Sequence, residues 1–311
     1  MAIAPVLTVG SVNVDRVVTV DRMPTAGETV IGGAPARLPG GKGGNQAVAA
    51  ARLGARVACV ACVGDDDDGA LVRASLAGDG IDLTGVRTAA DAPTGSAAVF
   101  VDAQSQNMIV VSRGANDLLT AEQAAGAVRD VRPGVVGLSL EIPLAAAVAA
   151  AHAAAQAGAR VVANLSPSST ADAELAAVCD VVIVNEHEAA ALLGDEVPAE
   201  LSAAAASALV GRARVRGAHH VIVTRGAADT LLLDGHAGTF AVAPAYTVDP
   251  VDTTGCGDAF AGALMAGLAA GVSLAAACEN ANATAALAAT GVGAQSSYPS
   301  RAAVDAFRAA S

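Results

Sequence analysis

The chain has 311 residues, a formal net charge of −12, 53% hydrophobic residues and only 2% aromatic residues. Nucleic-acid backbones require a basic surface and single strands require aromatic stacking platforms, so this composition argues against a nucleic-acid partner. Much of the hydrophobic fraction is alanine, which indicates a core built by close approach of helices to a sheet rather than by large side chains.

The N-terminal segment and the cysteines favour a soluble, cytoplasmic protein without a membrane partner. Residues 1–14 lack the basic and long apolar regions of a secretory signal, and the alanine-rich run 144–157 is too short and too polar to span a bilayer. Five cysteines form an odd set without framework spacing, which favours reduced thiols. Cys59 and Cys62 form a C-x-x-C within a strand-like run, and buried strand thiols are favoured over a metal site because no second pair follows.

Short β-branched runs alternate with alanine-rich segments along the chain. The predicted strands are Val6–Val9, Arg56–Val63, Val135–Leu140, Arg160–Asn164, Val181–Asn185 and Val221–Thr224. The predicted helices are 45–53, 68–78, 144–157, 201–216 and 259–268. Such alternation with continuous apolar strands predicts an α/β fold in which a mostly parallel sheet is covered by helices on both faces.

Two segments, 12–39 and 94–113, break this pattern because they are richer in Thr, Val, Gly and Pro. Ala97–Asp102 and Asn107–Ser112 within them alternate like half-buried strands. We expect these segments to form antiparallel strands outside the main sheet that pair into one small flap. No linker is long enough to separate independent units, so a single domain over 1–311 is expected.

The glycine-rich stretch Gly255-Cys256-Gly257 stands directly before Asp258 and a helix-like run of small residues. Such a turn at a helix start binds anions, because its free N–H groups and the positive end of the helix dipole point the same way. A carboxylate in that position can take a proton from a hydroxyl while the amides stabilise a transferring phosphoryl group. The alternative is that Asp258 simply occupies a first helical turn, where acids are favoured.

Several polar residues follow predicted strands, and ligand sites in open α/β sheets lie at the carboxyl ends of the strands. They are Asn13, Asp15, Glu141, Asn185, Glu188 and the run Thr224-Arg225-Gly226. Asp258 also follows a loop at this end of the pattern. This convergence favours the catalytic interpretation of Asp258.

A second glycine cluster, Gly40 to Gln46, precedes a predicted helix. It is not a Walker A loop, because no Ser or Thr follows Lys42, and it does not follow a strand as a dinucleotide-binding G-x-G-x-x-G would. Adjacent glycines let the backbone approach a small polar ligand, and Lys42 and Asn45 can donate hydrogen bonds to hydroxyls. A flexible loop before a capped helix is the alternative.

Together these motifs closely resemble the ribokinase branch of the PfkB carbohydrate-kinase family over nearly the whole chain. The matching segments are Gly10 to Asp15, the P-x-x-G-E-T turn Pro24 to Thr29, Gly40 to Ala47, the G-D-D-x-x-G segment Gly64 to Gly69, the N-x-x-E element Asn185 to Glu188, the signature Asp252 to Asp258, and Gly293 to Gln295. The resemblance implies a three-layer α/β/α sandwich with a small β-sheet lid formed by about 12–39 and 94–113. It further implies a homodimer that associates through this lid.

The same resemblance implies a role for each matching residue. Asn13, Asp15, Gly41, Lys42, Asn45, Glu141 and Asp258 would hold the sugar, with Asp258 as the base and the amides of Gly255, Cys256 and Gly257 as the anion hole. Asn185, Glu188, Thr224, Arg225, Gly226, Gly257 and Asn282 would bind ATP and its Mg²⁺. Asp252, Thr254, Ala288, Gly291, Gly293 and Ser297 would hold a monovalent cation, K⁺.

The resemblance thus implies ATP-dependent phosphorylation of D-ribose at its 5-hydroxyl. Alternatives are another sugar or nucleoside kinase of the family, a sugar-binding protein without catalysis, and a dehydrogenase, which the missing G-x-G-x-x-G opposes. The chain departs from the family pattern at Arg113, at Arg225, and at Asn164-Leu165-Ser166-Pro167 in place of N-P-A-P. Arg113 bears on the preference for ribose, because residues near the lid set sugar selectivity.

Overall fold

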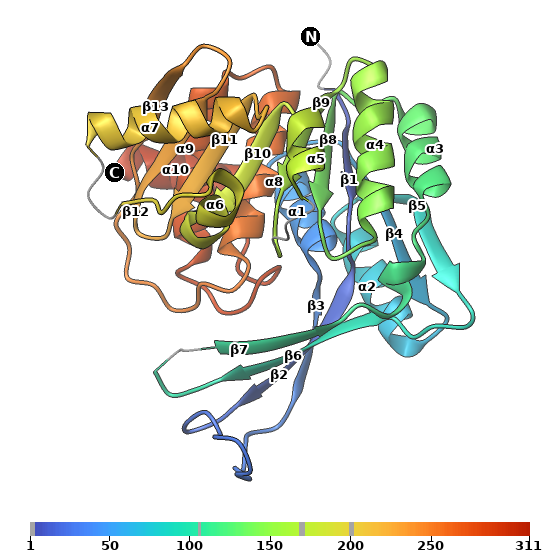
Figure 1. Ribbon diagram of the computed structural model, residues 1–311. Coiled ribbons are helices and arrows are strands. Elements are labelled where there is room, and N and C mark those ends of the chain that lie inside the picture. The colour runs from blue at the N-terminus through green and yellow to red at the C-terminus, as the bar shows by residue number, and fades with distance from the viewer. Residues whose placement is uncertain (1–3, 105–106, 168–171, 199–201) are drawn as a thin grey trace.

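Valine-rich parallel strands form the centre of the computed structural model, which describes residues 4–104, 107–167, 172–198 and 202–311 (Figure 1). Over these residues the main sheet has the strand order β13-β12-β11-β10-β9-β8-β1-β4-β5. Its strands are β1 (Val6–Val9), β4 (Val57–Gly64), β5 (Asp82–Ala89), β8 (Val135–Ser139), β9 (Arg160–Asn164), β10 (Val181–Asn185), β11 (His220–Arg225), β12 (Ala228–Asp234) and β13 (Thr239–Ala243). All neighbouring strands pair in parallel except β11–β12 and β12–β13, which pair antiparallel at one edge. The predicted mostly parallel sheet is confirmed.

Helices cover both faces of this sheet, so the predicted three-layer sandwich is also confirmed (Figure 1). One hydrophobic cluster includes η1 (Gly114–Leu118), α3 (Ala121–Val131), α4 (Leu144–Gln156), α5 (Asp172–Val178), α6 (Glu186–Leu193) and α7 (Ala203–Val215). The other includes α1 (Lys42–Arg52), α2 (Asp67–Gly78), α8 (Cys256–Ala269), α9 (Leu274–Ala288) and α10 (Arg301–Ala310). Cys59 and Cys62 of β4 belong to different clusters and are both buried, so this C-x-x-C consists of strand thiols that pack on opposite faces of the sheet.

Helices α1 and α8 cross closely on the second face. A Cβ atom at Gly262 of α8 would lie 2.6 Å from the Ala49 Cβ atom and 2.6 Å from the Gln46 carbonyl oxygen. Only glycine lets the two helix backbones approach to this distance. The crossing places the first turn of α8 beside the first turns of α1, where the two glycine-rich segments of the sequence meet.

A second, smaller sheet projects beyond the carboxyl ends of the main strands (Figure 1). Its order is β3-β2-β6-β7, from β2 (Asn13–Thr19), β3 (Ala36–Gly40), β6 (Gly95–Val101) and β7 (Asn107–Ser112). The expected antiparallel pairing is correct for β2–β3 and β6–β7 but wrong for β2–β6, which pair in parallel. The reason is that β2 and β6 each follow a main strand, β1 and β5 respectively, and so leave the body in the same direction.

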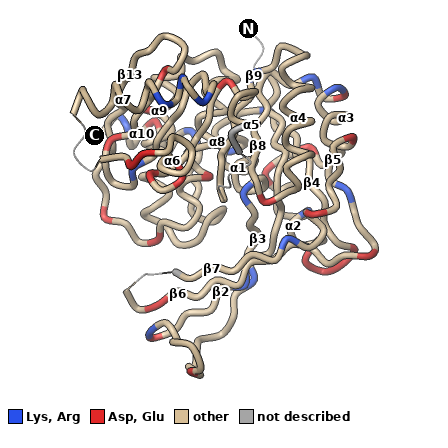
Figure 2. Tube along the Cα trace, in the orientation of Figure 1, with Lys and Arg blue, Asp and Glu red and all other residues tan. Residues whose placement is uncertain are grey.

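Charged side chains connect the small sheet to the body. Asp68 of α2 accepts a hydrogen bond from Arg16 of β2 at 2.5 Å and another from Arg37 of β3. Elsewhere Lys and Arg are scattered along the described trace among acidic positions (Figure 2). Among the described residues, no helix has the length and apolar character needed to cross a membrane.

Candidate active site

A cavity of about 320 Å³ lies between the small sheet and the body. Its walls come from β2, β3 and β6 on one side and from loops around Asp252 and Gln295 on the other. Asp15 lines this cavity, which has the size of a small-molecule pocket. The carboxyl ends of the main strands open toward the same region, as expected for an open α/β sheet.

Asp258 lies in the first turn of α8 and is only 6% exposed. Its Oδ2 atom accepts a hydrogen bond from Asn45 Nδ2 at 3.0 Å, and its Oδ1 atom accepts one from Gln46 Nε2 at 3.0 Å. A surface acid that merely suits a helix dipole would not be buried against two amides. Sequence reasoning missed Gln46, although it stands next to Asn45 in the second glycine motif.

The loop before Asp258 depends on glycine. Gly255 is the N-cap of α8 with a φ of 74°, and its carbonyl oxygen accepts a hydrogen bond from Tyr298 Oη at 2.9 Å. The Cys256 N–H donates to the Thr253 carbonyl oxygen at 3.2 Å. To contact a phosphoryl group, this N–H must share its hydrogen between that carbonyl oxygen and a phosphoryl oxygen. Tyr298 was not predicted as a site residue, because nothing in its local sequence shows that it contacts this loop.

The Cys256 thiol is expected to resist alkylation. Burial, together with the nearby Asp252 and Asp258 carboxylates, raises its pKa to about 11. Since the thiolate is the nucleophile, iodoacetamide at neutral pH should leave activity intact, and Cys256→Ala should retain turnover within about two-fold. Enzyme assays with intact-mass spectrometry would check this; rapid labelling of Cys256 with loss of activity would contradict it.

Ser11, Asn13, Asn116 and Glu141 form a cluster of buried polar residues, two of which are predicted to bind the sugar. Glu141, which is 7% exposed, accepts hydrogen bonds on Oε2 from Ser11 Oγ at 2.6 Å and from Asn13 Nδ2 at 3.2 Å. Asn116 Nδ2 in turn donates to Asn13 Oδ1 at 2.7 Å and fixes that amide. Ser11 and Asn116 are additions to the predicted set.

The second glycine cluster is an ordered backbone contact rather than a flexible loop. Gly41 has a φ of 85°, and a Cβ atom there would lie 2.6 Å from the Asn13 backbone nitrogen. A Cβ atom on Gly40 would collide with the Asp15 carboxylate. The Lys42 N–H donates to Ser11 Oγ at 3.0 Å. The glycines therefore let β2 and the start of α1 pack directly against each other.

Charges converge on Lys42 and Asp15. Burial alone would lower the pKa of the Lys42 ammonium, but the carboxylates of Asp258, Glu141, Glu188 and Asp15 outweigh it and raise this pKa. Burial, helped by the negative charges of Glu141 and Asp258 and opposed by Lys42, raises the pKa of Asp15 to about 7. Asp15 therefore titrates near neutral pH in the folded protein.

This titration predicts a pH-dependent stability. The pKa of Asp15 rises from 3.8 to about 7 on folding, so its stabilising contribution is fully present below about pH 4 and is lost as the pH rises through 7. Stability should therefore fall more steeply between about pH 5 and pH 8 in the wild type than in Asp15→Asn, which cannot titrate. Urea unfolding at both pH values measures this, and parallel pH dependences would show that Asp15 does not titrate in this range.

The predicted nucleotide residues lie at the carboxyl ends of β10 and β11. Asn185 caps α6, where its Oδ1 accepts from the Glu188 N–H at 2.8 Å and Glu188 Oε2 accepts from the Asn185 N–H at 2.9 Å. The N-x-x-E spacing is therefore also a capping box. The Thr224 hydroxyl donates to the Val184 carbonyl oxygen at 3.3 Å, and Gly226 follows β11 in the left-handed region.

Two further predicted nucleotide residues have other partners. Arg225 Nε lies 3.5 Å from Glu186 Oε1, and its Nη2 donates to the Pro198 carbonyl oxygen at 3.2 Å. Asn282 of α9 accepts from the Thr230 hydroxyl at 2.7 Å and donates to the Pro244 carbonyl oxygen at 2.9 Å. The structure thus places both beside the β11–β13 edge of the sheet rather than next to Asp258.

The predicted cation loops lie together. Asp252 accepts the Thr254 N–H on one carboxylate oxygen and the Gly293 N–H on the other, both at 2.8 Å. Burial would raise the pKa of Asp252, but these hydrogen bonds outweigh it and lower the pKa below its ordinary value. A Cβ atom on Gly291 would lie 2.8 Å from that of Ser297, and the Gly291 N–H donates to the Ala288 carbonyl oxygen at 3.1 Å, so these three residues are also adjacent.

Arg113, a departure from the family pattern, lies beside the polar cluster of Glu141 and Asn116. Its Nη2 atom donates to the Leu140 carbonyl oxygen at 3.4 Å, one residue before Glu141, and its Nη1 atom lies 3.4 Å from Asp117 Oδ1. Its backbone carbonyl oxygen accepts from Asn116 Nδ2 at 3.0 Å. The guanidinium of Arg113 therefore contacts the backbone of the segment that carries Glu141.

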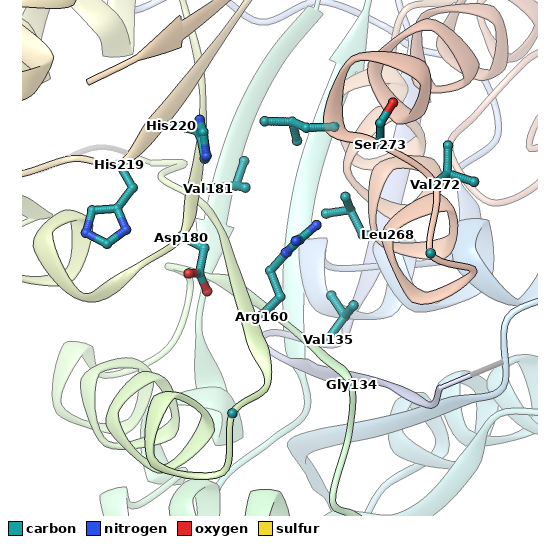
Figure 3. Close-up of a pocket in the computed structure, with 13 residues that line it drawn as sticks. Gly134, Val135, Arg160, Asp180, Val181, His219, His220, Leu268, Val272 and Ser273 are labelled. Carbon is teal, nitrogen blue, oxygen red and sulfur yellow. The ribbon is translucent and has the colours of Figure 1, made fainter. Parts of the chain in front are cut away.

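A second cavity, of about 540 Å³, lies at the opposite end of the strands (Figure 3). It is lined by Gly134, Val135, Gly158, Arg160, Asp180, Val181, His219, His220, Leu268, Gly271, Val272, Ser273 and Leu274. These residues come from the amino ends of β8 to β11 and the turn between α8 and α9. None of the predicted site residues lines this cavity.

Comparisons with known proteins agree with this fold. The chain is 36% identical to ribokinase from Haemophilus influenzae over 94% of each chain, and 35% identical to deoxyribokinase from Salmonella typhi over 95% of each. It superposes on Arabidopsis thaliana ribokinase complexed with ribose and ATP with a TM-score of 0.85 at 30% identity, over 99% of each chain. The pfkB family of carbohydrate kinases matches residues 4–301. The chain therefore belongs to the pfkB family of carbohydrate kinases.

Proposed function

We propose that this protein is an ATP-dependent kinase that phosphorylates D-ribose to D-ribose 5-phosphate. The observation that carries the proposal is the position of Asp258, buried at the start of α8 between the glycine loop and the polar sugar cluster. A base at that point can reach a sugar hydroxyl and the phosphoryl group that it attacks.

The residues divide the sugar-binding task by their chemistry. Asp15 and Glu141 offer carboxylate oxygens, and Asn13, Lys42 and Asn45 offer N–H donors, so together they match the hydroxyls of a polyol. Gly41 would contribute backbone groups to the same site. A phosphorylated sugar would instead require further cations at the same place.

In the reaction, Asp258 takes the proton of the 5-hydroxyl as the bond between that oxygen and the γ-phosphorus forms. The bond from the γ-phosphorus to the bridging oxygen breaks in line, and ADP leaves with that electron pair. The N–H groups of Gly255, Cys256 and Gly257 would stabilise the charge on the transferring phosphoryl group. The small sheet would act as a lid that excludes water from this step.

The electrostatics of the site support a divalent cation with the nucleotide. Four carboxylates, Asp15, Glu141, Glu188 and Asp258, act on Lys42, and a triphosphate brought next to them adds further negative charge. Carboxylate oxygens are hard donors that suit Mg²⁺, and no cluster of three or more His, Cys, Asp or Glu side chains suited to a metal occurs among the described residues. Mg²⁺ held mainly by phosphates and water, near Asn185 and Glu188, fits this donor set and supplies charge neutralisation at the phosphates.

The remaining predictions extend the proposal. Thr224, Arg225, Gly226 and Asn282 would line the nucleotide, and the oxygen-rich loops at Asp252 and Gly291 to Ser297 would hold K⁺ beside the anion hole. β7 is an edge strand that exposes Met108 at 47% and Val110 at 60%, which supports a homodimer formed through the lid. We propose one kinase domain over 1–311, acting in the cytoplasm.

The acceptor can be identified by ATP-to-ADP turnover with Mg²⁺ and K⁺ against D-ribose, 2-deoxyribose, fructose, adenosine and pseudouridine. A reaction without acceptor measures the hydrolysis background. The highest kcat/KM with ribose would support the proposal, whereas preference for 2-deoxyribose or another acceptor would overturn the sugar assignment and keep the kinase. If no acceptor is turned over, sugar binding measured by calorimetry would identify a sugar-binding protein without catalysis.

A further inference from the structure

Both carboxylate oxygens of Asp258 are held by side-chain amides from adjacent residues of α1. Asn45 belongs to the proposed sugar site, but Gln46 does not, and it is only 2% exposed with its Nε2 atom 3.0 Å from Asp258 Oδ1. Each carboxylate oxygen has two lone-pair positions, so one remains free on each oxygen after the amide bonds form. The amides therefore select which lone pairs of the base can face a sugar hydroxyl.

The orientation of the Asn45 amide is itself determined by a hydrogen bond from Gln295. Gln295 Nε2 donates to Asn45 Oδ1 at 3.0 Å, and the Ser75 hydroxyl donates to Gln295 Oε1 at 3.2 Å. An amide has a donor end and an acceptor end, so a donor placed at the oxygen of Asn45 turns its nitrogen toward Asp258. The hydroxyl of Ser75 orients Gln295 in the same way.

The backbone of Gln295 is held in place by Arg52. Arg52 Nη1 donates to the Gln295 carbonyl oxygen and to the Tyr298 carbonyl oxygen, the latter at 3.2 Å. The same guanidinium binds Asp79 through two hydrogen bonds of 2.8 and 3.1 Å. The segment 295–298 therefore contacts Asn45 through Gln295 and the Gly255 carbonyl through Tyr298.

We propose that Gln46 and Gln295 are positioning residues for proton transfer to Asp258. Gln46 orients the carboxylate directly, and Gln295 orients it through Asn45, which keeps a second N–H for the sugar. We call Gln46, Asn45 and Gln295 the amide clamp. This inference rests on the proposed function, because it assigns roles within the same reaction.

The test compares kcat and sugar KM for Gln46→Met and Gln295→Met, which keep side-chain length and remove the amide. Gln46 is not itself among the residues proposed to hold the sugar and acts on the base alone. Gln46→Met should therefore lower kcat by about 10-fold or more and leave the sugar KM within about two-fold, since small misplacements of a reacting group cost up to about 10²-fold. Gln295→Met should lower kcat and raise the sugar KM, because Asn45 serves both. Gln156→Met, an exposed position at the end of α4, is the matched control and should match the wild type.

A double-mutant comparison separates positioning from general destabilisation. In an Asn45→Ala background, Gln295→Met should have no further effect on kcat, because the residue through which it acts is gone. An equal effect in both backgrounds, or a wild-type kcat in Gln46→Met, would overturn the proposal while leaving the kinase assignment intact. Absence of turnover in the wild type would contradict the proposed function and this inference together.

Gln295→Glu keeps the test decisive if a methionine variant does not fold. An ionised glutamate has the same shape but cannot donate to Asn45, whereas a protonated one can. The ratio of its kcat/KM to that of the wild type should therefore rise as the pH is lowered from about 8 to about 6. A ratio that stays near one across this range would contradict the clamp, because loss of the donor would then have no effect.

Discussion

Replacing Asp258 with asparagine should lower kcat by about 10²–10⁴-fold, the usual contribution of a general base. The variant keeps the size of the side chain, so the cavity and the first turn of α8 are preserved, but it cannot accept the hydroxyl proton. The KM for ATP should change little, because Asp258 contacts Asn45 and Gln46 rather than the predicted nucleotide residues. Steady-state turnover with the preferred acceptor measures both quantities.

Asp305→Asn provides the control for Asp258→Asn. Asp305 is exposed on α10 and belongs to none of the predicted site motifs, and its neutralisation changes the net charge of the chain by the same amount. Wild-type kinetics in Asp305→Asn, together with a deep loss in Asp258→Asn, would assign the effect to the site. An Asp258→Asn enzyme that keeps more than about a tenth of wild-type kcat would exclude Asp258 as the general base.

Gly255→Ala should damage both the stability and the activity of the protein. A left-handed φ of 74° costs a residue with a Cβ about 1–2 kcal/mol. The new Cβ atom would also lie 2.5 Å from Tyr298 Oη and 2.6 Å from the Ala294 Cβ atom, so the loop must shift. Because that loop carries the proposed anion hole, kcat/KM should fall on the order of 10²-fold, as expected when reacting groups are displaced by about 1 Å.

Gly271→Ala is the control that separates the backbone strain in Gly255→Ala from the displacement of its loop. Gly271 has a similar φ of 79°, but a Cβ atom there would have no heavy atom within 4 Å beyond its chain neighbours, so alanine meets only the backbone penalty. Urea unfolding should show a loss of about 1–2 kcal/mol for Gly271→Ala with unchanged kinetics, and a larger loss for Gly255→Ala. Equal destabilisation of the two variants would show that the contact with Tyr298 and Ala294 has no energetic consequence.

The parts of the fold with strong local signals could be predicted from the sequence. The continuous apolar strands matched β1, β4 and β8 to β11 closely, since burial on both faces leaves an uninterrupted valine-rich pattern. β5 was missed because this edge strand mixes exposed polar residues with Gly85. α9 was missed because Asn280, Asn282 and Thr284 dilute its helical pattern. Helix α1 begins at Lys42 rather than residue 45, because its first turn contains Gly43, which packs directly against Gly10 and Ser11 between β1 and β2.

The residues of the candidate site also differ in whether a local sequence pattern predicts them. Asn13, Asp15, Glu141 and Asp258 could be predicted, because each follows a strand or opens a helix at the edge where such sites form. Gln46, Asn116 and Tyr298 could not be predicted on that basis. Their positions depend on how distant elements cross, such as the approach of α1 to α8 at Gly262, and no local pattern encodes that approach.

The hydrogen bonds around Asp258 also have a consequence for synthesis of the chain. Asn45 and Asp258 are 213 residues apart, and Asn45 and Gln295 are 250 apart. Chains emerge from the ribosome N-terminal end first, and contacts this distant in sequence form only when both partners are available. The glycine motif near residue 41 is therefore synthesised early. The Asn45 side chain cannot form its hydrogen bonds with Asp258 and Gln295 until almost the entire polypeptide has been translated.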